Sequence, residues 1–317
     1  MRYRMTLAFA IAAIIINQVA CAQYPDKPVT ILTGYGPGST GDQIARGLAK
    51  AALGHFPQPL VVTNRPGESG TLAISEALRA KPDGYVLALG TAGNLTVQPH
   101  VSVQRYAGPD TYVPVAKLVN QPNVLMARTD SRWKTAKEFL VYAKAHPGEI
   151  SVGVAGRATI AHLNLEQLKR AANIDLKVSF YDAPLQVQAA LTGEVDAAIV
   201  GAAPMMPHVQ SGRALVLGVF GERRLRVLPD APTFKELGLD VTLGTFQAIV
   251  APSGTPPSIV EALAAAIRKA MSEPSFISLV EETGNIIEYE DPQAFAADLR
   301  EKFAKNGELV RALGLAK

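Results

Sequence analysis

The sequence predicts an α/β fold in two lobes, and three observations support this prediction. Short runs rich in valine, isoleucine and leucine alternate with segments of helical periodicity, a pattern typical of parallel sheets with helices on both faces. Glycine-rich turns follow three of the predicted strands, at residues 34–41, 90–94 and 156–159. The strand–helix units fall into two sets, before and after about residue 124, and 317 residues suffice for two cores.

The first set opens with a strand at 29–33, where β-branched side chains dominate. A helix follows the glycine-rich turn and carries Ile44 and Leu48 on one face. The further elements of this set are a strand at 60–63, a helix at 71–80 that stops near Pro82, and strands at 85–89, 113–119 and 123–127.

The second set follows an amphipathic helix at 135–145, which Pro147 and Gly148 end. Its elements are a strand at 150–155, a helix at 160–172, a strand at 176–181, a helix at 185–191, and strands at 195–200, 216–220 and 245–250. The remainder is predicted to be mainly helical, at 258–271, 275–282 and 292–313. Sites in such sheets lie at the carboxyl ends of the strands, so the three glycine-rich turns are candidate site loops.

The loop Gly36-Pro37-Gly38-Ser39-Thr40-Gly41 joins a predicted strand to a predicted helix, a context in which helix N-termini bind anions. Its spacing also satisfies G-x-G-x-x-G, the dinucleotide fingerprint. That interpretation requires an acidic residue about 20 positions later. Asn64 and Arg65 occupy that position instead. Because an arginine can bind the 2′-phosphate of NADP, NADP binding stays open as an alternative. Pro37 within the fingerprint and the export signal favour a smaller anion over a dinucleotide as the ligand of this loop. The alternative that the glycines only shape a tight turn, without binding an anion, stays open.

Other chemistry-bearing residues give weaker patterns. Position 37 is a proline, so Ser39 lacks the G-x-S-x-G spacing of a nucleophile elbow. No histidine pair has a metal-binding spacing, so we expect neither a metal nor a cofactor. His162 falls in the first turn of a predicted helix, where it either faces the loop or is structural. Arg157 precedes the same helix, where its guanidinium either binds a carboxylate bidentately or is simply solvated.

Residues 1–22 have the pattern of an export signal. Arg2 and Arg4 precede an apolar segment at 7–16, and Ala20-Cys21-Ala22 fits a cleavage site. The apolar run is shorter than the roughly 20 residues of a membrane span. A lipoprotein modified at Cys21 is the less favoured alternative, because Gln18 stands where an aliphatic residue is expected.

Cleavage after Ala22 would leave a chain without cysteine, which excludes disulfides and thiolate chemistry. It would also leave 29 basic and 28 acidic residues. So balanced a charge gives no reason to expect nucleic acid or a membrane surface as a partner.

A series of short motifs runs through the chain: Tyr24-Pro25-Asp26-Lys27-Pro28, Gly36-Pro37-Gly38-Ser39-Thr40-Gly41-Asp42, Asn64-Arg65-Pro66-Gly67, Lys81-Pro82-Asp83-Gly84-Tyr85, Pro122-Asn123-Val124-Leu125, His162-Leu163, Leu228-Pro229-Asp230-Ala231-Pro232-Thr233 and Ala251-Pro252-Ser253-Gly254-Thr255-Pro256. In this order they resemble the substrate-binding proteins of tripartite tricarboxylate transporters, the Bug-type extracytoplasmic solute receptors. The resemblance covers nearly the whole chain after the signal.

This resemblance implies a type II periplasmic-binding-protein fold. In that fold two α/β lobes, each a mostly parallel sheet flanked by helices, are joined by two crossing strands that act as a hinge. We expect the crossings near residues 123–127 and 245–250. Residues 23–123 with 249–317 would then form lobe 1, and residues 124–248 lobe 2.

Family members typically bind a carboxylate through backbone N–H groups and small side chains of two loops in the first lobe, often with ordered water. Carried over by position, the ligand-binding residues expected in lobe 1 are Tyr35, Pro37, Gly38, Ser39, Asp42, Thr91 and Asn94. Those expected in lobe 2 are Ala155, Gly156, Thr159, His162, Tyr181 and Asp182, to which the argument from the loop itself adds Arg157.

Three departures from the family pattern fall where specificity should be set. The family's Y-K-G-x-x-P segment reads Tyr181-Asp182-Ala183-Pro184, a polar pair is replaced by Gly201-Ala202, and W-x-G reads Thr245-Phe246-Gln247-Ala248. The loss of these polar contacts should enlarge or neutralise the far end of the cleft. We therefore expect a ligand with one carboxylate and a bulkier or less polar tail rather than a short dicarboxylate.

The sequence thus predicts a periplasmic binding protein, not an enzyme, that captures a small organic carboxylate by lobe closure and delivers it to membrane permease subunits. We expect a monomer. Two alternatives stay open: an exported α/β hydrolase-like enzyme that uses Ser39 or His162, and a ligand-sensing partner of a membrane kinase.

Overall fold

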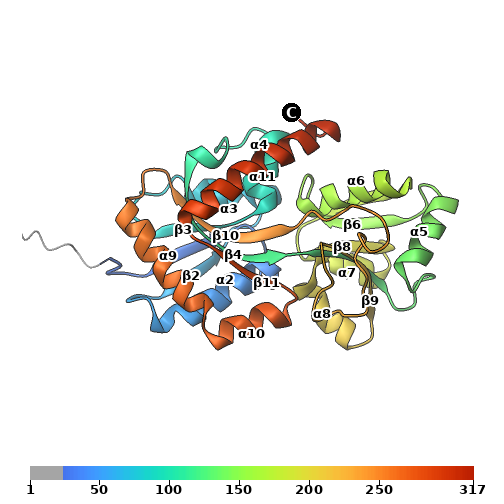
Figure 1. Ribbon diagram of the computed structural model, residues 1–317, viewed down its shortest axis with the longest axis horizontal. Coiled ribbons are helices and arrows are strands. Elements are labelled where there is room, and N and C mark those ends of the chain that lie inside the picture. Colours follow the sequence, from blue (N-terminus) through green and yellow to red (C-terminus); the bar gives the residue numbers. More distant parts are fainter. Residues whose placement is uncertain (1–23) are drawn as a thin grey trace, which may run out of the picture.

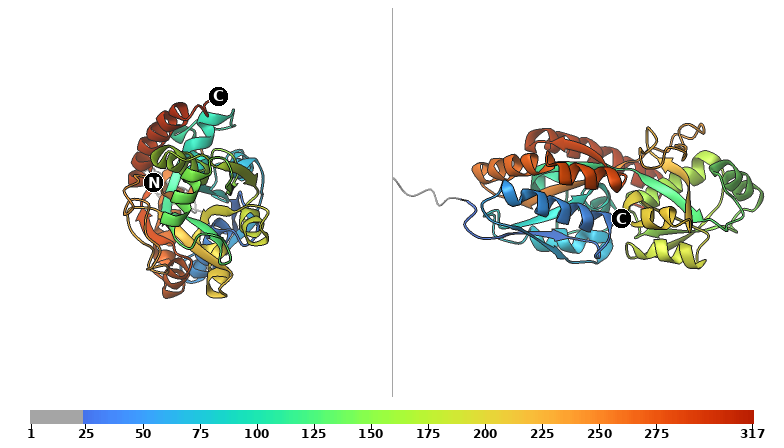
Figure 2. Two further views of the ribbon diagram at one scale, coloured as in Figure 1. Left: turned by 90° about the vertical axis from the view of Figure 1, so that its right-hand side faces the viewer. Right: turned by 90° about the horizontal axis from the view of Figure 1, so that it is seen from below.

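The computed structural model describes residues 24–317, so the export signal expected at 1–22 lies outside the described residues. The described chain forms two lobes, each built on one β-sheet with helices packed against it (Figure 1). The view from below in Figure 2 shows the lobes end to end along the long axis. The predicted two-lobed α/β fold is therefore confirmed. Among residues 24–317, no helix is both long and apolar enough to cross a membrane.

Lobe 1 contains a six-stranded sheet, sheet A, with the strand order β11-β4-β10-β3-β1-β2. β1 is parallel to β2 and β3, whereas β10 is antiparallel to β3 and β4, and β11 is antiparallel to β4. The strands are β1 (Val29–Thr33), β2 (Leu60–Asn64), β3 (Val86–Thr91), β4 (Tyr112–Gln121), β10 (Thr245–Pro252) and β11 (Ile286–Glu290).

Lobe 2 contains a five-stranded sheet, sheet B, with the strand order β7-β6-β8-β5-β9. β6 is parallel to β7 and β8, whereas β5 is antiparallel to β8 and β9. The strands are β5 (Asn123–Arg128), β6 (Ser151–Ala155), β7 (Lys177–Tyr181), β8 (Ala197–Gly201) and β9 (Ala214–Phe220).

Both sheets are mixed rather than mostly parallel, and that detail of the prediction is wrong. The difference comes from the strands next to the lobe crossings. β5 enters sheet B between β8 and β9 and runs against both, and β10 enters sheet A between β3 and β4 and runs against both. A buried apolar run reads the same in either direction, so periodicity did not show the reversal.

The helices surround both sheets. Those of lobe 1 are α2 (Thr40–Ala51), α3 (Thr71–Ala77), α4 (Gln98–Val101), α9 (Pro257–Met271), α10 (Pro274–Glu282) and α11 (Pro292–Ala312), with short helical turns η1 (Ala52–Gly54), η2 (Glu68–Gly70), η3 (Gly93–Val97) and η4 (Pro109–Thr111). Those of lobe 2 are α5 (Ala136–Ala145), α6 (Ile160–Ala172), α7 (Leu185–Thr192) and α8 (Ala202–Gln210). The sequence pattern did not predict α4, α8, η3 or β11. α8 contains two prolines, at 204 and 207, and proline is uncommon inside a helix.

The chain passes between the lobes twice. β4 of sheet A leads through Pro122 directly into β5 of sheet B, and proline supplies no N–H to either ladder. The return segment, residues 221–244, leads from β9 to β10, which pairs with β4 from Thr245 onward. The lobe limits expected from the sequence, 23–123 with 249–317 and 124–248, remain a proposal. The strand pairing argues against the limit at residue 248, because residues 245–248 pair with β4 in sheet A of lobe 1.

The apolar cores explain how the lobes meet. One cluster of lobe 1 includes Ile44 and Leu48, the two α2 residues predicted to share a face. Another cluster combines lobe 1 residues such as Leu95 with Ile160 and Leu163, at the start of α6 in lobe 2. The N-terminal end of α6 therefore packs against lobe 1, beside the space that separates the two sheets.

Candidate ligand-binding cleft

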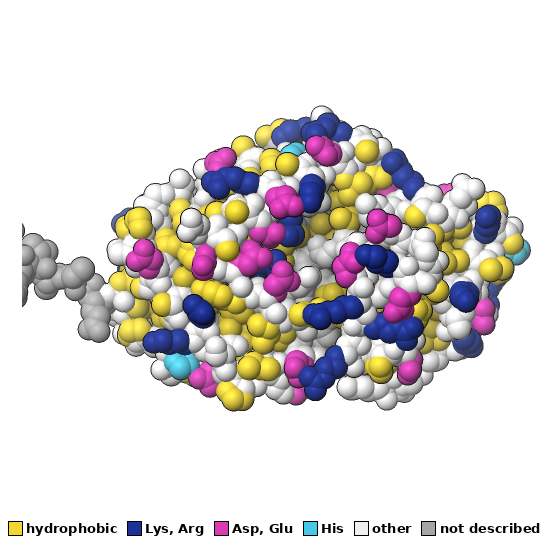
Figure 3. Space-filling model, viewed as in Figure 1, with side chains coloured by type: hydrophobic (Ala, Val, Ile, Leu, Met, Phe, Trp, Pro, Cys, Tyr) yellow, Lys and Arg dark blue, Asp and Glu magenta, His cyan; other side chains and the backbone are white. Residues whose placement is uncertain are grey.

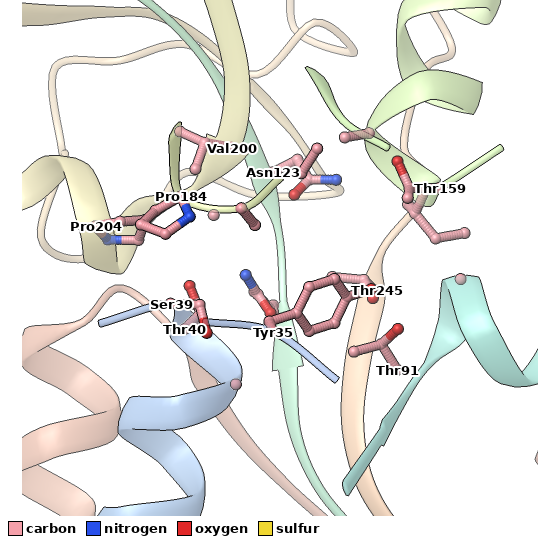
Figure 4. A pocket seen from close by; sticks show the side chains of 18 of the residues that line it. Tyr35, Ser39, Thr40, Thr91, Asn123, Thr159, Pro184, Val200, Pro204 and Thr245 are labelled. Atoms are coloured by element: carbon pink, nitrogen blue, oxygen red, sulfur yellow. The ribbon is translucent and has the colours of Figure 1, made fainter. Parts of the chain in front are cut away.

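A cleft lies between the two lobes and encloses about 630 Å³ of empty space, part of it open to solvent. Figure 4 shows Ser39, Thr40, Tyr35 and Thr91 of lobe 1 facing residues of lobe 2 across this space. The cleft thus lies at the carboxyl ends of β1 and β3, where the sequence placed the first two candidate loops.

The first turn of α2 forms part of the lobe 1 wall. Ser39 is the N-cap residue, and its hydroxyl accepts a hydrogen bond from the N–H of Asp42 at 3.3 Å. The N–H groups of Thr40 and Gly41 have no intrahelical acceptor, and both residues line the cleft. These groups and the positive end of the helix dipole favour an anion at this position.

The first turn of α6 has the same arrangement on the other lobe. Thr159 is its N-cap residue, and the Thr159 hydroxyl accepts a hydrogen bond from the N–H of His162 at 3.3 Å. Ile160 and Ala161, whose N–H groups begin the helix, line the cleft, as does Gly201 at the N-cap of α8. Helix N-termini of both lobes therefore border the same space.

The side chains that line the cleft are uncharged throughout the described part of the chain. The one titratable group among them is the phenol of Tyr35, which donates to the carbonyl of Ser69 at 3.2 Å. Burial raises the pKa of Tyr35, so the phenol stays protonated. An anion in this cleft would be held by helix ends, N–H groups and hydroxyls rather than by a cation.

The two walls differ in polarity. Lobe 1 contributes the hydroxyls of Tyr35, Ser39, Thr40, Thr91 and Thr245 (Figure 4). Lobe 2 contributes mostly apolar side chains: Ala155, Ile160, Ala161, Ala183, Pro184, Ile199, Val200 and Pro204. Such a cleft suits a ligand with a charged end and an apolar part.

Five of the predicted site residues line the cleft: Tyr35, Ser39, Thr91, Ala155 and Thr159. Another three, Gly156, Tyr181 and Asp182, line a smaller cavity of about 310 Å³ that also includes Tyr35, Ala155 and Ala183. The remaining six are not among the lining residues: Pro37, Gly38, Asp42, Asn94, Arg157 and His162.

Asp42 holds the first site loop in shape from behind. Its carboxylate accepts hydrogen bonds from the N–H of Gly38 at 3.0 Å, from Nδ2 of Asn64 at 2.8 Å and from Nε of Arg46 at 2.9 Å. Burial alone would raise the pKa of Asp42, but these donors outweigh burial and lower it. The ionised carboxylate of Asp42 therefore fixes the loop that leads into α2 at neutral pH.

Asn94, His162 and Arg157 also act from outside the cleft. The side-chain oxygen of Asn94 accepts the N–H of Thr91 at 2.7 Å, and His162 is buried behind the loop that precedes α6. The Arg157 side chain is exposed. Its carbonyl, rather than its guanidinium, is engaged, because it accepts a hydrogen bond from Nε2 of Gln98 at 2.7 Å.

The lobes are in contact on two sides of the cleft. Gln98 of α4 donates to the carbonyls of Arg157, at 2.7 Å, and Ala158, at 3.0 Å, which lie just before α6. On the α8 side, Gly201 approaches α2 so closely that a Cβ there would lie 3.0 Å from Oγ1 of Thr40. The structure therefore represents a closed arrangement of the lobes.

Most of the lining residues that were not predicted belong to lobe 2 or to the connecting strands. Thr40, Gly41 and Gly93 lie in two of the predicted site loops, and the three segments expected at the far end of the cleft contribute Ala183, Pro184, Gly201, Thr245 and Gln247. The lining residues that were missed are Gln121, Asn123, Ile160, Ala161, Gln186, Ile199, Val200 and Pro204. One local signal was available, namely the amides of Gln121 and Asn123 on either side of Pro122.

The site offers few groups for metal binding or nucleophilic catalysis. Within residues 24–317, no cluster of three His, Cys, Asp or Glu side chains could hold a metal ion. The lining residues of the described chain include no histidine that could act as a base toward Ser39.

Comparison with known proteins agrees with this geometry. The model of the tripartite tricarboxylate transporter family receptor, TctC, matches residues 44–315. The chain is 30% identical over 312 residues to the UPF0065 protein in the gbd 5′ region of Cupriavidus necator, which covers 98% of this chain and 95% of that protein.

Two solved structures are similar over nearly the whole chain. The periplasmic binding protein BugD has a TM-score of 0.87 and 26% identity, over 93% of this chain and 100% of that chain. MatC from Rhodopseudomonas palustris with bound malate has a TM-score of 0.84 and 26% identity, over 90% of this chain and 100% of that chain.

Proposed function

Because the chain belongs to the tripartite tricarboxylate transporter receptor family of Bug-type solute-binding proteins, we propose that it captures a small organic carboxylate by closing its lobes and delivers it to a membrane transporter. A ligand that contacts both lobes binds the closed state better than the open state. A differential affinity of a few kcal/mol is enough to shift the population.

One observation carries this proposal: the first turns of α2 and α6, on opposite lobes, border a single uncharged cleft. Helix N-termini stabilise an anion without a basic side chain. The malate bound in the similar MatC structure supports a carboxylate as that anion. Of the predicted residues, we propose Tyr35, Ser39, Thr91, Ala155 and Thr159 as direct ligand contacts.

The location and partners follow from the family and the N-terminal segment. We propose that residues 1–22 direct export and are then cleaved, so that the protein works in the periplasm as a monomer. Its macromolecular partners would be the permease subunits of a tripartite tricarboxylate-type transporter. Delivery to a membrane kinase would use the same cleft and differ only in the partner.

We favour binding without catalysis. An exported hydrolase that used Ser39 would need a base beside its hydroxyl. That hydroxyl instead accepts the N–H of Asp42 as a helix cap, a structural task. The proposed function requires no covalent step.

A thermal-shift screen of the purified protein against organic acids tests the proposal. A ligand that binds only the folded state raises stability by RT ln(1 + [L]/Kd), so a carboxylate ligand should raise the melting temperature in proportion to the logarithm of its concentration. Amides of the same acids, which lack the negative charge, should give no shift. If no carboxylate shifts the melting temperature while ester hydrolysis is measurable, the receptor function is wrong.

A further inference from the structure

Four amide side chains line the cleft, and they come from the strands and the helix around its base. Gln121 ends β4, Asn123 begins β5, Gln247 lies in β10, and Gln186 lies in the first turn of α7. Each is at most 7% exposed. In Figure 4 the Asn123 amide extends into the space between Val200 and Thr159.

These amides are largely unpartnered. Nε2 of Gln247 donates to Oε1 of Gln121 at 2.7 Å, but Oε1 of Gln247 and Oε1 of Gln186 are buried without a hydrogen-bond partner in the described chain. The Asn123 amide makes no hydrogen bond within residues 24–317, but, unlike those two oxygens, it is not fully buried and lines the cleft. Buried polar groups left unpaired are costly and rare, so such a cluster indicates that a ligand supplies the missing bonds.

The chemistry of an amide restricts what that ligand group can be. An amide offers both a donor and an acceptor. A second carboxylate has acceptors alone and would leave the amide oxygens unpaired. An ammonium group would satisfy those oxygens, but no acidic side chain lines the cleft to balance its charge. A hydroxyl both donates and accepts, and it is neutral.

On the basis of the proposed function, we propose that the bound carboxylate carries an uncharged hydroxyl substituent and that the amides of Asn123 and Gln186 hold this hydroxyl. The carboxylate would lie at the helix N-termini, and the carbon chain against the apolar wall of lobe 2. Ordered water is the competing occupant, because a water molecule also donates and accepts. Water at the amides would give no preference between a hydroxy acid and its parent acid.

Matched acids separate these two occupants. Isothermal titration of the purified protein compares lactate with propionate, 3-hydroxybutyrate with butyrate, and malate with succinate. In the pairs that bind, the hydroxy acid should bind at least about tenfold more tightly, because its parent leaves buried amides unpaired. Equal affinity within every pair would overturn the inference while leaving the proposed function intact. Failure of all six acids and of every acid in the wider screen would overturn both.

Two substitutions then test the assigned residues. Asn123→Leu and Gln186→Met keep the approximate shape but remove the amide, so each should reduce the hydroxyl preference to less than about threefold while the parent acid binds as before. Asn120→Leu is the matched control, because Asn120 lies one residue before Gln121 on β4 and lines a separate groove rather than the cleft. A preference that survives both cleft substitutions, or that is lost in Asn120→Leu as well, would overturn the assignment.

Discussion

The N–H of Ala158 donates a hydrogen bond to Nδ1 of His162 at 3.0 Å. Ala158 lies in the loop that precedes α6, and His162 lies in the first turn of that helix. This bond fixes Nδ1 as the unprotonated nitrogen, so the ring is neutral and carries its proton on Nε2. Ala158 has a φ of 52°, a left-handed conformation that is unfavourable for alanine. His162 therefore stabilises a strained turn in the wall of the cleft.

Acid should weaken this turn. Burial lowers the pKa of His162, Arg157 and Lys169 lower it further, and Glu166 opposes them only in part. Above the ordinary value of about 6.5, neither folded nor unfolded protein binds a proton here. As the pH falls from there toward the lower folded pKa, the unfolded state binds more protons, so stability decreases.

The variant His162→Asn isolates this effect, since an asparagine oxygen can accept the Ala158 N–H but does not titrate. We expect the wild type to lose about 1 kcal/mol more than the variant between pH 7.5 and 5, the net value of one hydrogen bond. Urea unfolding at the two pH values measures this. The pKa values of His100 and His208 are also lowered, but both residues are present in both proteins and cancel. Parallel pH profiles would contradict the prediction.

Ser39 combines a structural role with a proposed binding role, and two substitutions separate them. Ser39→Ala removes the cap of α2 and should cost about 1 kcal/mol of unfolding free energy, with a modest loss of carboxylate affinity. Ser39→Asp keeps a good cap but places a negative charge at the cleft. It should fold as stably as the wild type and bind carboxylates at least about a hundredfold more weakly. Unfolding curves and titrations on both variants measure this, and unimpaired carboxylate binding by Ser39→Asp would place the anion elsewhere.

How far the sequence could predict the site depends on whether the signal was local. The loops that contain Ser39 and Thr159 were predicted because a strand, a glycine-rich or small polar turn and a helix follow one another along the chain, and the family resemblance then named the two residues. Gln121 and Asn123 were missed because they reach the cleft only through the pairing of distant strands. Asp42 shows the limit from the other side. The resemblance to the family placed Asp42 in the site, but it could not show that the Asp42 carboxylate faces the loop behind the cleft.

The fold shows the same division. Element types were predicted wherever a long periodic run had clear stops, as in α6, whose bounds match the prediction. The direction of β10 and β5 depends on how the chain crosses between lobes, which no local pattern contains. Residues 286–290 were assigned to no element from the sequence, and β11, which they form, is only half buried and lies at the edge of sheet A.

Lys117 is buried beneath acidic side chains that gather over β11 and α11 (Figure 3). Its Nζ lies 2.7 Å from carboxylate oxygens of Glu288 and Glu290 and 3.5 Å from Asp298. Burial alone would lower the pKa of Lys117, but these acids outweigh burial and raise it. The stability that Lys117 contributes is thus fully present below its ordinary value of about 10.4 and is lost only as the pH rises through the higher folded pKa.

Lys117→Met should therefore destabilise the protein by about 3 kcal/mol at pH 7.5, because three carboxylates lose their cation. Urea unfolding of the wild type and the variant at this pH measures the difference. Lys305→Met is the control, because Lys305 pairs with Glu301 on the exposed surface, where a pair contributes about 0–1 kcal/mol. If both variants lose the same free energy of unfolding, the charge of Lys117 does not stabilise the three carboxylates around it.

Gly201 should act as the contact point for lobe closure. A Cβ at this position would lie 1.9 Å from Nε2 of Gln121 and 3.0 Å from Oγ1 of Thr40, both from lobe 1. The backbone angles of Gly201, φ −66° and ψ 157°, suit any residue, so a side chain adds no local strain. Gly201→Val should thus leave the melting temperature without ligand nearly unchanged but weaken carboxylate binding at least about tenfold, since closure must overcome a clash.

The loss of carboxylate affinity should increase with the size of the side chain at position 201, because the clash lies between the lobes rather than within one of them. Gly201→Ala displaces only the end of Gln121 and should cost less affinity than Gly201→Val. Small-angle scattering with saturating ligand should show a larger radius of gyration for the valine variant than for the wild type. Gly54→Ala is the control, since a Cβ there meets nothing within 4 Å. If Gly201→Val binds and compacts like the wild type, the lobes close without bringing Gly201 against Thr40, and the closed arrangement seen here is not the ligand-bound one.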